Sequence, residues 1–205
     1  RLSVLLTGSV AVEQWNQPDR KVTFYSIKAV VDSILSRLNI KGLLTEDASN
    51  SDFAYGVQYK RGEKVLVEFG SISRAALKLA DVGNEVFYAD FDWDLIIKTI
   101  RNNKITYQEV SKFPAVKRDL SLLLNKDISF GQLKQIAQKT ERNLLKEVNV
   151  FDVYEGNKLP EGKKSYALSF VLQDVEKTLT DKQIDAIMQK LILNFEKEAG
   201  AEIRK

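Results

Sequence analysis

Three side chains late in the sequence, Tyr154, Asp152 and Arg204, together have the chemistry to hold a nucleobase. A tyrosine ring offers a flat face for stacking, a guanidinium offers a second plane, and a carboxylate accepts hydrogen bonds from a base edge. Small or polar residues would surround them on the same surface: Ser121, Ser165, Ala167 and Ser169. An alternative stays open, because half-exposed sheets commonly carry serine and alanine on their solvent side without binding anything.

A second candidate is the segment 90–94, DFDWD, whose three aspartates have the spacing that opens a calcium-binding loop. That loop requires glycine at its sixth position and glutamate at its twelfth, where this chain has Leu95 and Arg101. We therefore expect a solvated strand face, with Phe91 and Trp93 buried on the opposite side, and no metal site.

The composition narrows the chemistry further, because the 205 residues include no cysteine and no histidine. This excludes thiolate chemistry, disulfides, the usual zinc sites and a histidine general base. The sequence also lacks a glycine-rich phosphate-binding loop and any run of about 18 apolar residues that could span a membrane. The net charge of +3 comes from residues 112–205, which hold 17 Lys and Arg against 14 Asp and Glu. That balance would tolerate a polyanion as partner.

The second half of the chain has the pattern of a β-α-β-β-α-β domain, which is the ferredoxin-like order. Helices are expected from residue 129 to about 139 and from residue 180 to 199, because SFGQ and TDKQ are capping-box sequences and Gly200 suits a helix end. We expect four strands, at residues 118–124, 146–155, 164–173 and 201–205.

In this order both helices cover one face of the sheet and leave the other face open. Alternation places Phe151 and Val153 toward the helices, and it places the base-binding candidates on the open face. Strict alternation also puts Val148 and Val150 on the open face. Either they form an apolar patch there, or a bulge near Asn149 changes the register.

The pattern of the first half of the sequence predicts a mixed, largely antiparallel α+β module. A polar linker near residues 104–112 joins it to the second half. The chain begins with Arg1 inside a strand pattern, so we expect a piece of a longer protein, and the lack of cysteine fits a cytoplasmic setting. We expect strands at 2–6 and 86–93, a hairpin at 53–69, and helices at 27–38, 74–80 and 94–103.

Several long motifs resemble one known family. FPAVKRDLSLLL (113–124), VFDVYEGNKLPEGKKSYALSFVLQDVEKTLTDKQI (150–184) and GAEIRK (200–205) are similar to the ferredoxin-fold anticodon-binding domain of phenylalanine–tRNA ligase β subunits. VEQWNQPDRKVTFYSIKAVVDSIL (12–35) and VEFGSISRAALKLADVGNEVFYADFDWDLI (67–96) resemble the catalytic-like module that precedes this domain in the same subunit.

The resemblance implies that residues 112–205 bind a tRNA anticodon. It implies that residues 1–111 are part of a non-catalytic, class II synthetase-like module that supports subunit assembly. The intact cytoplasmic enzyme would be an α2β2 assembly that attaches phenylalanine to tRNA(Phe) using ATP and magnesium, with the chemistry on the α subunit. No catalytic residue, metal ligand or cofactor site is implied within this stretch.

The resemblance also assigns anticodon contacts by position. Tyr154 and Arg204 match the residues that bracket the first anticodon base, and Asp152, Ser121 and Ser165 match its polar partners. The same residues fall on the open face by alternation alone.

Two other functions remain as alternatives. A purely structural heterodimerisation module with a ferredoxin-like domain would have its open face covered by protein. A stand-alone enzyme is disfavoured because histidine, cysteine and a phosphate-binding loop are all absent.

Overall fold

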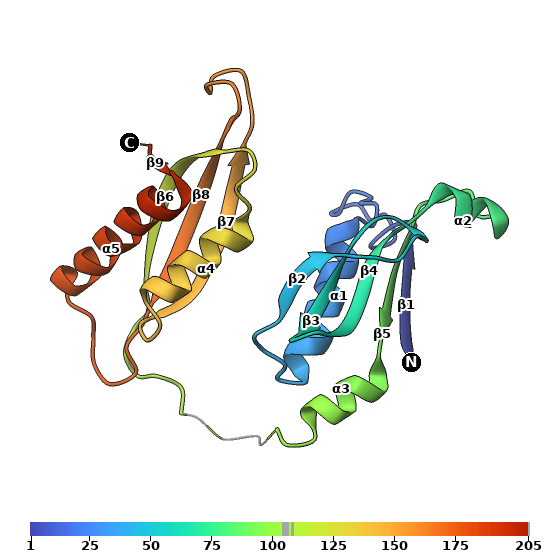
Figure 1. Ribbon diagram of the computed structural model, residues 1–205, viewed down its shortest axis with the longest axis horizontal. Helices are drawn as coiled ribbons and strands as arrows, with labels where there is room; N and C mark the ends of the chain where they lie inside the picture. Colours follow the sequence, from blue (N-terminus) through green and yellow to red (C-terminus); the bar gives the residue numbers. More distant parts are fainter. Residues whose placement is uncertain (104–106, 108, 205) are drawn as a thin grey trace. The chain divides into compact units, whose positions relative to one another are not determined.

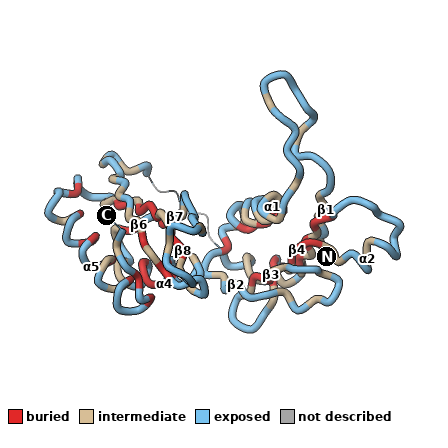
Figure 2. Tube along the Cα trace, turned by 90° about the horizontal axis from the view of Figure 1, so that it is seen from above, coloured by how far each residue is buried: buried red, intermediate tan, exposed pale blue. Residues whose placement is uncertain are grey.

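The computed structural model describes residues 1–103, 107 and 109–204, and the chain divides into two compact units, residues 1–106 and 107–205 (Figure 1). In each unit the buried residues lie along the strands and the inward sides of the helices (Figure 2). The predicted linker near 104–112 lies partly outside the described residues, and so does Lys205 at the end of the last predicted strand. Among the described helices, none has the length and apolar character needed to cross a bilayer.

The N-terminal unit is built on one antiparallel sheet of five strands in the order β1-β5-β4-β3-β2. The predicted hairpin is confirmed as β3 and β4, and the three predicted helices are present. Its elements are β1 (Leu2–Thr7), α1 (Phe24–Arg37), β2 (Leu44–Asp47), β3 (Phe53–Arg61), β4 (Lys64–Ile72), α2 (Arg74–Leu79), β5 (Val86–Phe91) and α3 (Trp93–Ile100).

Helix α1 packs on one face of this sheet. Its apolar residues recur at helical spacing, and Ile27 and Val31 are fully buried. They meet alternate residues of the central strands, such as the paired Phe69 and Ala89, in one core. The helical period of α1 and the two-residue period of the strands therefore agree on one buried layer.

The predicted strand 86–93 is wrong in its last two residues. Strand β5 ends at Phe91, because the Asp92 carboxylate accepts a hydrogen bond from the backbone N–H of Leu95 at 3.0 Å and caps helix α3. Trp93 is accordingly the first residue of that helix and is half-buried, not a buried strand residue. Asp90, which precedes the last strand residue Phe91, forms an ion pair with Arg1.

Strand β2 was not predicted from the sequence. All four of its residues are exposed, and it pairs only with β3 at the edge of the sheet. A short edge strand that buries nothing carries no hydrophobic period, so the pattern that reveals the other strands is missing.

The C-terminal unit has the predicted β-α-β-β-α-β order, and its antiparallel sheet has the strand order β7-β8-β6-β9. The α+β class, with two antiparallel sheets, is thereby confirmed. The elements are β6 (Val116–Asn125), α4 (Phe130–Thr140), β7 (Leu145–Tyr154), β8 (Lys163–Leu172), α5 (Asp181–Ala199) and β9 (Glu202–Ile203).

Both helices of this unit begin where the capping-box sequences predict. The Ser129 hydroxyl accepts a hydrogen bond from the backbone N–H of Gln132, and the Thr180 hydroxyl accepts one from that of Gln183. The side-chain oxygen of each glutamine in turn accepts a hydrogen bond from the backbone N–H of its cap residue. Helix α5 ends at Gly200, whose φ of 57° lies in the left-handed region that glycine adopts without steric cost.

The two helices share one face of the sheet and one core. Leu133 of α4 and Leu191 and Phe195 of α5 are fully buried against Leu168 and Phe170 of β8. Because the residues that pack in this core alternate along β6 and β8, the residues between them point to the opposite face, which no helix of the unit covers (Figure 1).

Candidate nucleic-acid interface

A bulge in β7 decides which side chains stand on the open face of this sheet. The register of β7 on β8 shifts between Val150 and Asp152. These two residues pair with consecutive residues of β8, so Phe151 between them is the extra residue of a β-bulge. Val148 is therefore buried and Val150 packs against the core, so the bulge alternative is correct, with the bulge at Phe151. The prediction that Phe151 faces the core is wrong, because the bulge turns it out and leaves it exposed. Val153 does point to the helix side, opposite Tyr166, but it is exposed there and not part of the core.

Beyond the bulge, the pairing brings the candidate side chains together. Asp152 lies opposite Ala167, and Tyr154 lies opposite Ser165, so these four residues share the open face. Across β8, Ala167 is also paired with Ser121 of β6. The open face therefore carries a row of small residues on β8, flanked on the β7 side by a carboxylate and a ring.

All five residues predicted for base binding line one hollow of about 440 Å³ on this face. Ser169, also expected on the open face, lies outside the hollow and is almost fully buried. The residues that line the hollow are Ser121, Asp152, Tyr154, Lys158, Ser165, Ala167 and Arg204.

The floor and the rim of the hollow differ in accessibility. Ser165 is only 6% exposed and Ser121 is half-buried, with their hydroxyl oxygens 3.5 Å apart, so they form a low polar floor. Tyr154, Asp152 and Arg204 are exposed and stand at its sides. A flat ligand can therefore rest on the floor with an aromatic ring and a guanidinium within reach.

Arg204 is placed by backbone pairing and not by its own side chain. Strand β9 pairs with β6 through Ile203 and Glu202, and the backbone N–H of Arg204 donates to the carbonyl of Ser121 at 2.9 Å. The backbone of Arg204 is thus held beside the floor, while its guanidinium remains exposed to solvent.

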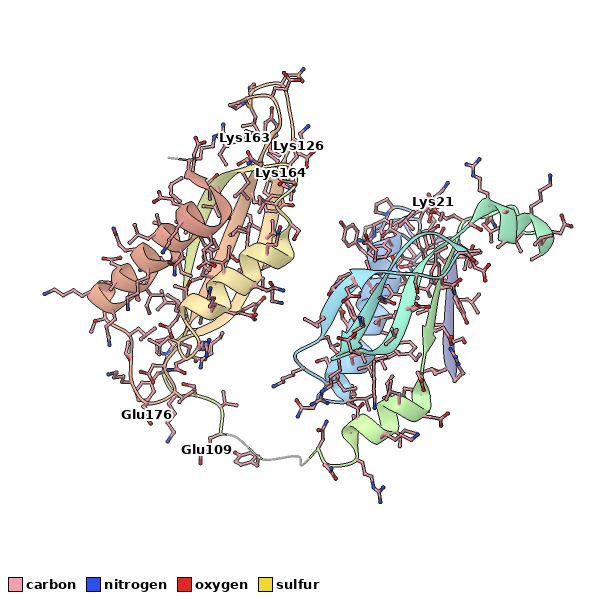
Figure 3. The ribbon with its side chains drawn as sticks, viewed as in Figure 1. Lys21, Glu109, Lys126, Lys163, Lys164 and Glu176 are labelled. Atoms are coloured by element: carbon pink, nitrogen blue, oxygen red, sulfur yellow. The ribbon has the colours of Figure 1, made fainter. Side chains whose placement is uncertain are left out.

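The structure adds Lys158, which the sequence reasoning missed. Lys158 lies in the loop between β7 and β8, where strand alternation says nothing about direction, yet its side chain lines the hollow. Further lysines lie at the same end of the unit: Figure 3 shows Lys126, Lys163 and Lys164 at the base of this loop. Lys164 is only 6% exposed with its ammonium over the Tyr166 ring on the helix side, and Lys163 pairs with Glu202. Lys158 therefore joins Arg204 in supplying positive charge at the hollow itself, where a phosphate would need it.

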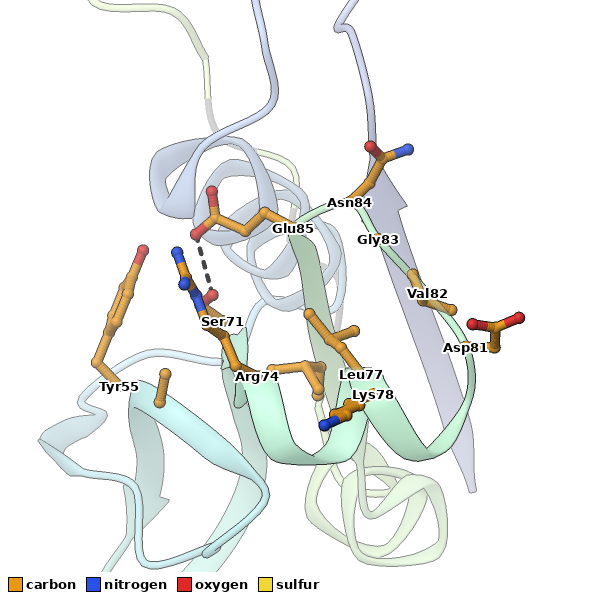
Figure 4. A pocket seen from close by; sticks show the side chains of 12 residues that line it. Tyr55, Ser71, Arg74, Leu77, Lys78, Asp81, Val82, Gly83, Asn84 and Glu85 are labelled. Atoms are coloured by element: carbon orange, nitrogen blue, oxygen red, sulfur yellow. Dashed lines mark hydrogen bonds between the residues drawn. The ribbon is translucent and has the colours of Figure 1, made fainter.

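A larger hollow of about 740 Å³ lies in the N-terminal unit, between α2 and the turn that leads into β5. Tyr55, Ser71, Arg74 and Glu85 supply polar groups to it, as Figure 4 shows. The Ser71 hydroxyl donates to the Glu85 carboxylate at 3.1 Å. Two of its polar groups therefore satisfy each other, and the hollow offers a ligand fewer free partners than its size suggests.

Comparison with known proteins relates each unit to a described domain. The family model of the ferredoxin-fold anticodon binding domain matches residues 111–204, and that of the phenylalanyl tRNA synthetase beta chain CLM domain matches residues 1–93. Relatives named phenylalanine–tRNA ligase beta subunit include that of Bacteroides thetaiotaomicron, 46% identical over 99% of this chain, and that of Porphyromonas gingivalis, 39% identical over all of it. The relative from Fusobacterium nucleatum is 32% identical over the whole chain.

These matches cover nearly the whole chain but only part of each relative. The chain spans 25% of the length of the first two relatives and 26% of the third. The matched domains are adjacent and in the same order as the two compact units. The chain therefore belongs to the phenylalanine–tRNA ligase β-subunit family and comprises its CLM domain and its ferredoxin-fold anticodon-binding domain.

Proposed function

We propose that residues 112–205 bind the anticodon of tRNA(Phe) on the open sheet face, with one base held in the hollow between Tyr154 and Arg204. The observation that carries this proposal is the convergence of a ring, a guanidinium, a carboxylate and two hydroxyls on one small-residue floor. Recognition of single-stranded RNA uses these groups, because an unstacked base presents both a π-face and hydrogen-bonding edges.

Each side chain has a distinct role in this proposal. The Tyr154 ring stacks on the base and the Arg204 guanidinium covers its other side. Asp152 accepts hydrogen bonds from amino or imino groups at the base edge, while Ser121 and Ser165 can donate to or accept from it. Lys158 at the rim meets a phosphate, which adds affinity without selecting a sequence.

We infer that residues 1–111 form a non-catalytic module of the same subunit. The intact enzyme would be a cytoplasmic α2β2 assembly that attaches phenylalanine to its tRNA using ATP and magnesium, with the reaction on the α subunit. No catalytic or metal-binding role is assigned to any residue of this chain.

A role in assembly with another subunit is favoured by one feature of the N-terminal unit. Residues 8–22 form a hairpin-like arm, closed by backbone hydrogen bonds between Val10 and Arg20 and between Val22 and Gly8. Trp15 lies in the turn at its tip and is 99% exposed. A tryptophan held this far into solvent is a typical anchor for a protein partner.

The test of anticodon binding uses the full-length β subunit assembled with its partner. Tyr154→Ala should weaken binding of tRNA(Phe) by about 1–3 kcal/mol, the usual contribution of a base–aromatic stack, and Tyr154→Phe should weaken it much less. Phenylalanine activation without tRNA should be unchanged in both variants. If Tyr154→Ala still distinguished wild-type from anticodon-mutated tRNA as the parent enzyme does, the proposal would be wrong.

A further inference from the structure

We propose that Phe151 and Lys117 form a second nucleotide subsite on the open face, which stacks the base of an unpaired nucleotide near the one held at Tyr154. This inference rests on the proposed function, since it takes the same RNA strand as ligand. It adds a subsite that neither strand alternation nor the anticodon contacts assigned by resemblance include.

The bulge in β7 is what brings Phe151 to this face. In a regular strand Phe151 would point to the helices, as the sequence pattern predicts. The register shift between Val150 and Asp152 lets Val150 pack in the core and turns Phe151 out of it. Its side chain is 56% exposed, which places a large apolar ring on the surface of β7, whereas Val148 on the same strand is buried.

Lys117 reaches Phe151 across the middle of the sheet. Side chains of β6 alternate between the two faces of the sheet. Lys117 lies an even number of residues from Ser121 and an odd number from the buried Leu122, so it stands on the open face. Its ammonium lies 5.7 Å from the centroid of the Phe151 ring. Strand β8 runs between them, and Ser169 on that strand is only 4% exposed although it faces the open side. Side chains from the flanking strands therefore close over this part of β8.

The pair has the two groups that a nucleotide of single-stranded RNA needs. The exposed ring of Phe151 accepts a base by stacking, which tolerates any base because every base has a π-face. The ammonium of Lys117 has no ion-pair partner among the described residues, so it is free to turn toward a phosphate.

The subsite is continuous with the hollow at Tyr154. Phe151 precedes Tyr154 by three residues on β7, a separation of about 10 Å along the strand. Asp152, between them, already lines the hollow. A strand of RNA that places one base at Tyr154 therefore passes Phe151 with a nearby nucleotide.

A single exposed apolar residue would normally need no explanation. Val153 shows the difference, because it is exposed on the same strand to a similar degree, 50%. It pairs with Tyr166, on the side that faces the helices, and lies outside the hollow. Val153 therefore gives a matched control for the loss of an exposed apolar side chain on β7.

The experiment measures binding of tRNA(Phe) to the assembled enzyme with Phe151→Ala and Val153→Ala in the β subunit. Phe151→Ala should weaken binding by roughly 5- to 150-fold, the range expected for one base–aromatic stack, and Val153→Ala should leave it unchanged. Phe151→Trp should retain binding. Thermal unfolding of each variant shows whether the fold is preserved.

Abasic tRNAs separate this subsite from the first one. Removing the base that stacks on Phe151 should abolish the effect of Phe151→Ala while leaving the effect of Tyr154→Ala in place. Equal affinities of Phe151→Ala and the parent enzyme, with Tyr154→Ala still weakened, would overturn the second subsite alone. If Tyr154→Ala also bound tRNA normally, the anticodon-binding proposal itself would fall.

Discussion

The ring of Tyr154 lies directly against Gly156. A Cβ atom at position 156 would come within 2.4 Å of the Tyr154 hydroxyl oxygen and 2.5 Å of its ring carbon Cζ, closer than atoms can approach. The absence of a side chain at Gly156 therefore allows the tyrosine to lie over the loop that follows β7. Gly156 positions the ring that forms one side of the hollow.

Gly156→Ala should displace the Tyr154 ring and weaken tRNA binding in the assembled enzyme, by an amount up to that of Tyr154→Ala. The fold should be retained, because a tyrosine can rotate away from the new methyl group. A suitable control in the same loop is Gly162→Ala. Gly162 has φ of 78° and open space around its Cα, so this change should lower stability without moving Tyr154. Equal tRNA affinity of Gly156→Ala and the parent would show that the position of the ring is unimportant.

Arg204→Ala should weaken tRNA binding and reduce the dependence of log K on log salt by about one charge, if the guanidinium also meets a phosphate. Strand pairing should survive, because it is the backbone N–H of Arg204 that bonds to Ser121. The measurement is a titration of tRNA at several salt concentrations. The control is Lys190→Ala. Lys190 is exposed on α5, on the helix side of the sheet, so this variant also loses one positive charge but should leave the salt dependence of tRNA binding unchanged.

Gly200→Ala should lower the free energy of unfolding of the C-terminal unit by about 1–2 kcal/mol, because an L-residue is strained at φ of 57°. Gly131→Ala should change stability in the opposite direction, by about 0.4–1 kcal/mol. Gly131 lies in the first turn of α4, and a Cβ there would meet only the Ser129 hydroxyl oxygen, at 3.7 Å. Urea unfolding of both variants tests the pair, and the same sign for both would contradict it.

We expect Tyr59 to make the stability of the N-terminal unit fall at alkaline pH. Burial raises the pKa of Tyr59 above its usual value, Lys28 opposes this and Asp32, which accepts its hydroxyl hydrogen at 2.9 Å, adds to it. A raised folded-state pKa stabilises the fold below the unfolded pKa of about 10, and this contribution is lost as pH rises through the folded value.

Tyr59→Phe should therefore lower stability at neutral pH by about 0.5–1.5 kcal/mol, the net contribution of one hydrogen bond, and should flatten the decline above pH of about 10. Urea unfolding between neutral and alkaline pH measures both effects. Tyr25→Phe, which changes a largely exposed ring, should leave the curve as in the parent. An unchanged alkaline decline in Tyr59→Phe would assign that decline to other groups.

Much of the C-terminal unit follows from local sequence. The capping boxes at Ser129 and Thr180 place both helix starts, because the cap, its glutamine and the bonds between them lie within four residues. The alternation along β8 predicts its buried and open sides for the same reason, since neighbouring side chains of a strand point to opposite faces. Once the order of elements is known, the open face follows, and with it the five predicted residues that line the hollow.

Tertiary structure decided the rest. Alternation along β7 already showed a conflict at Val148 and Val150 and left two outcomes open. Only the pairing of β7 with β8 decides for a bulge, places it at Phe151 and buries Val148. Asp92 stops β5 by capping α3, although its own strand pattern continues. Lys158 and the contact between Tyr154 and Gly156 depend on the path of a loop, whose residues follow no period. Sequence periodicity determines which face of a regular element is buried, whereas pairing between distant strands determines where that regularity breaks.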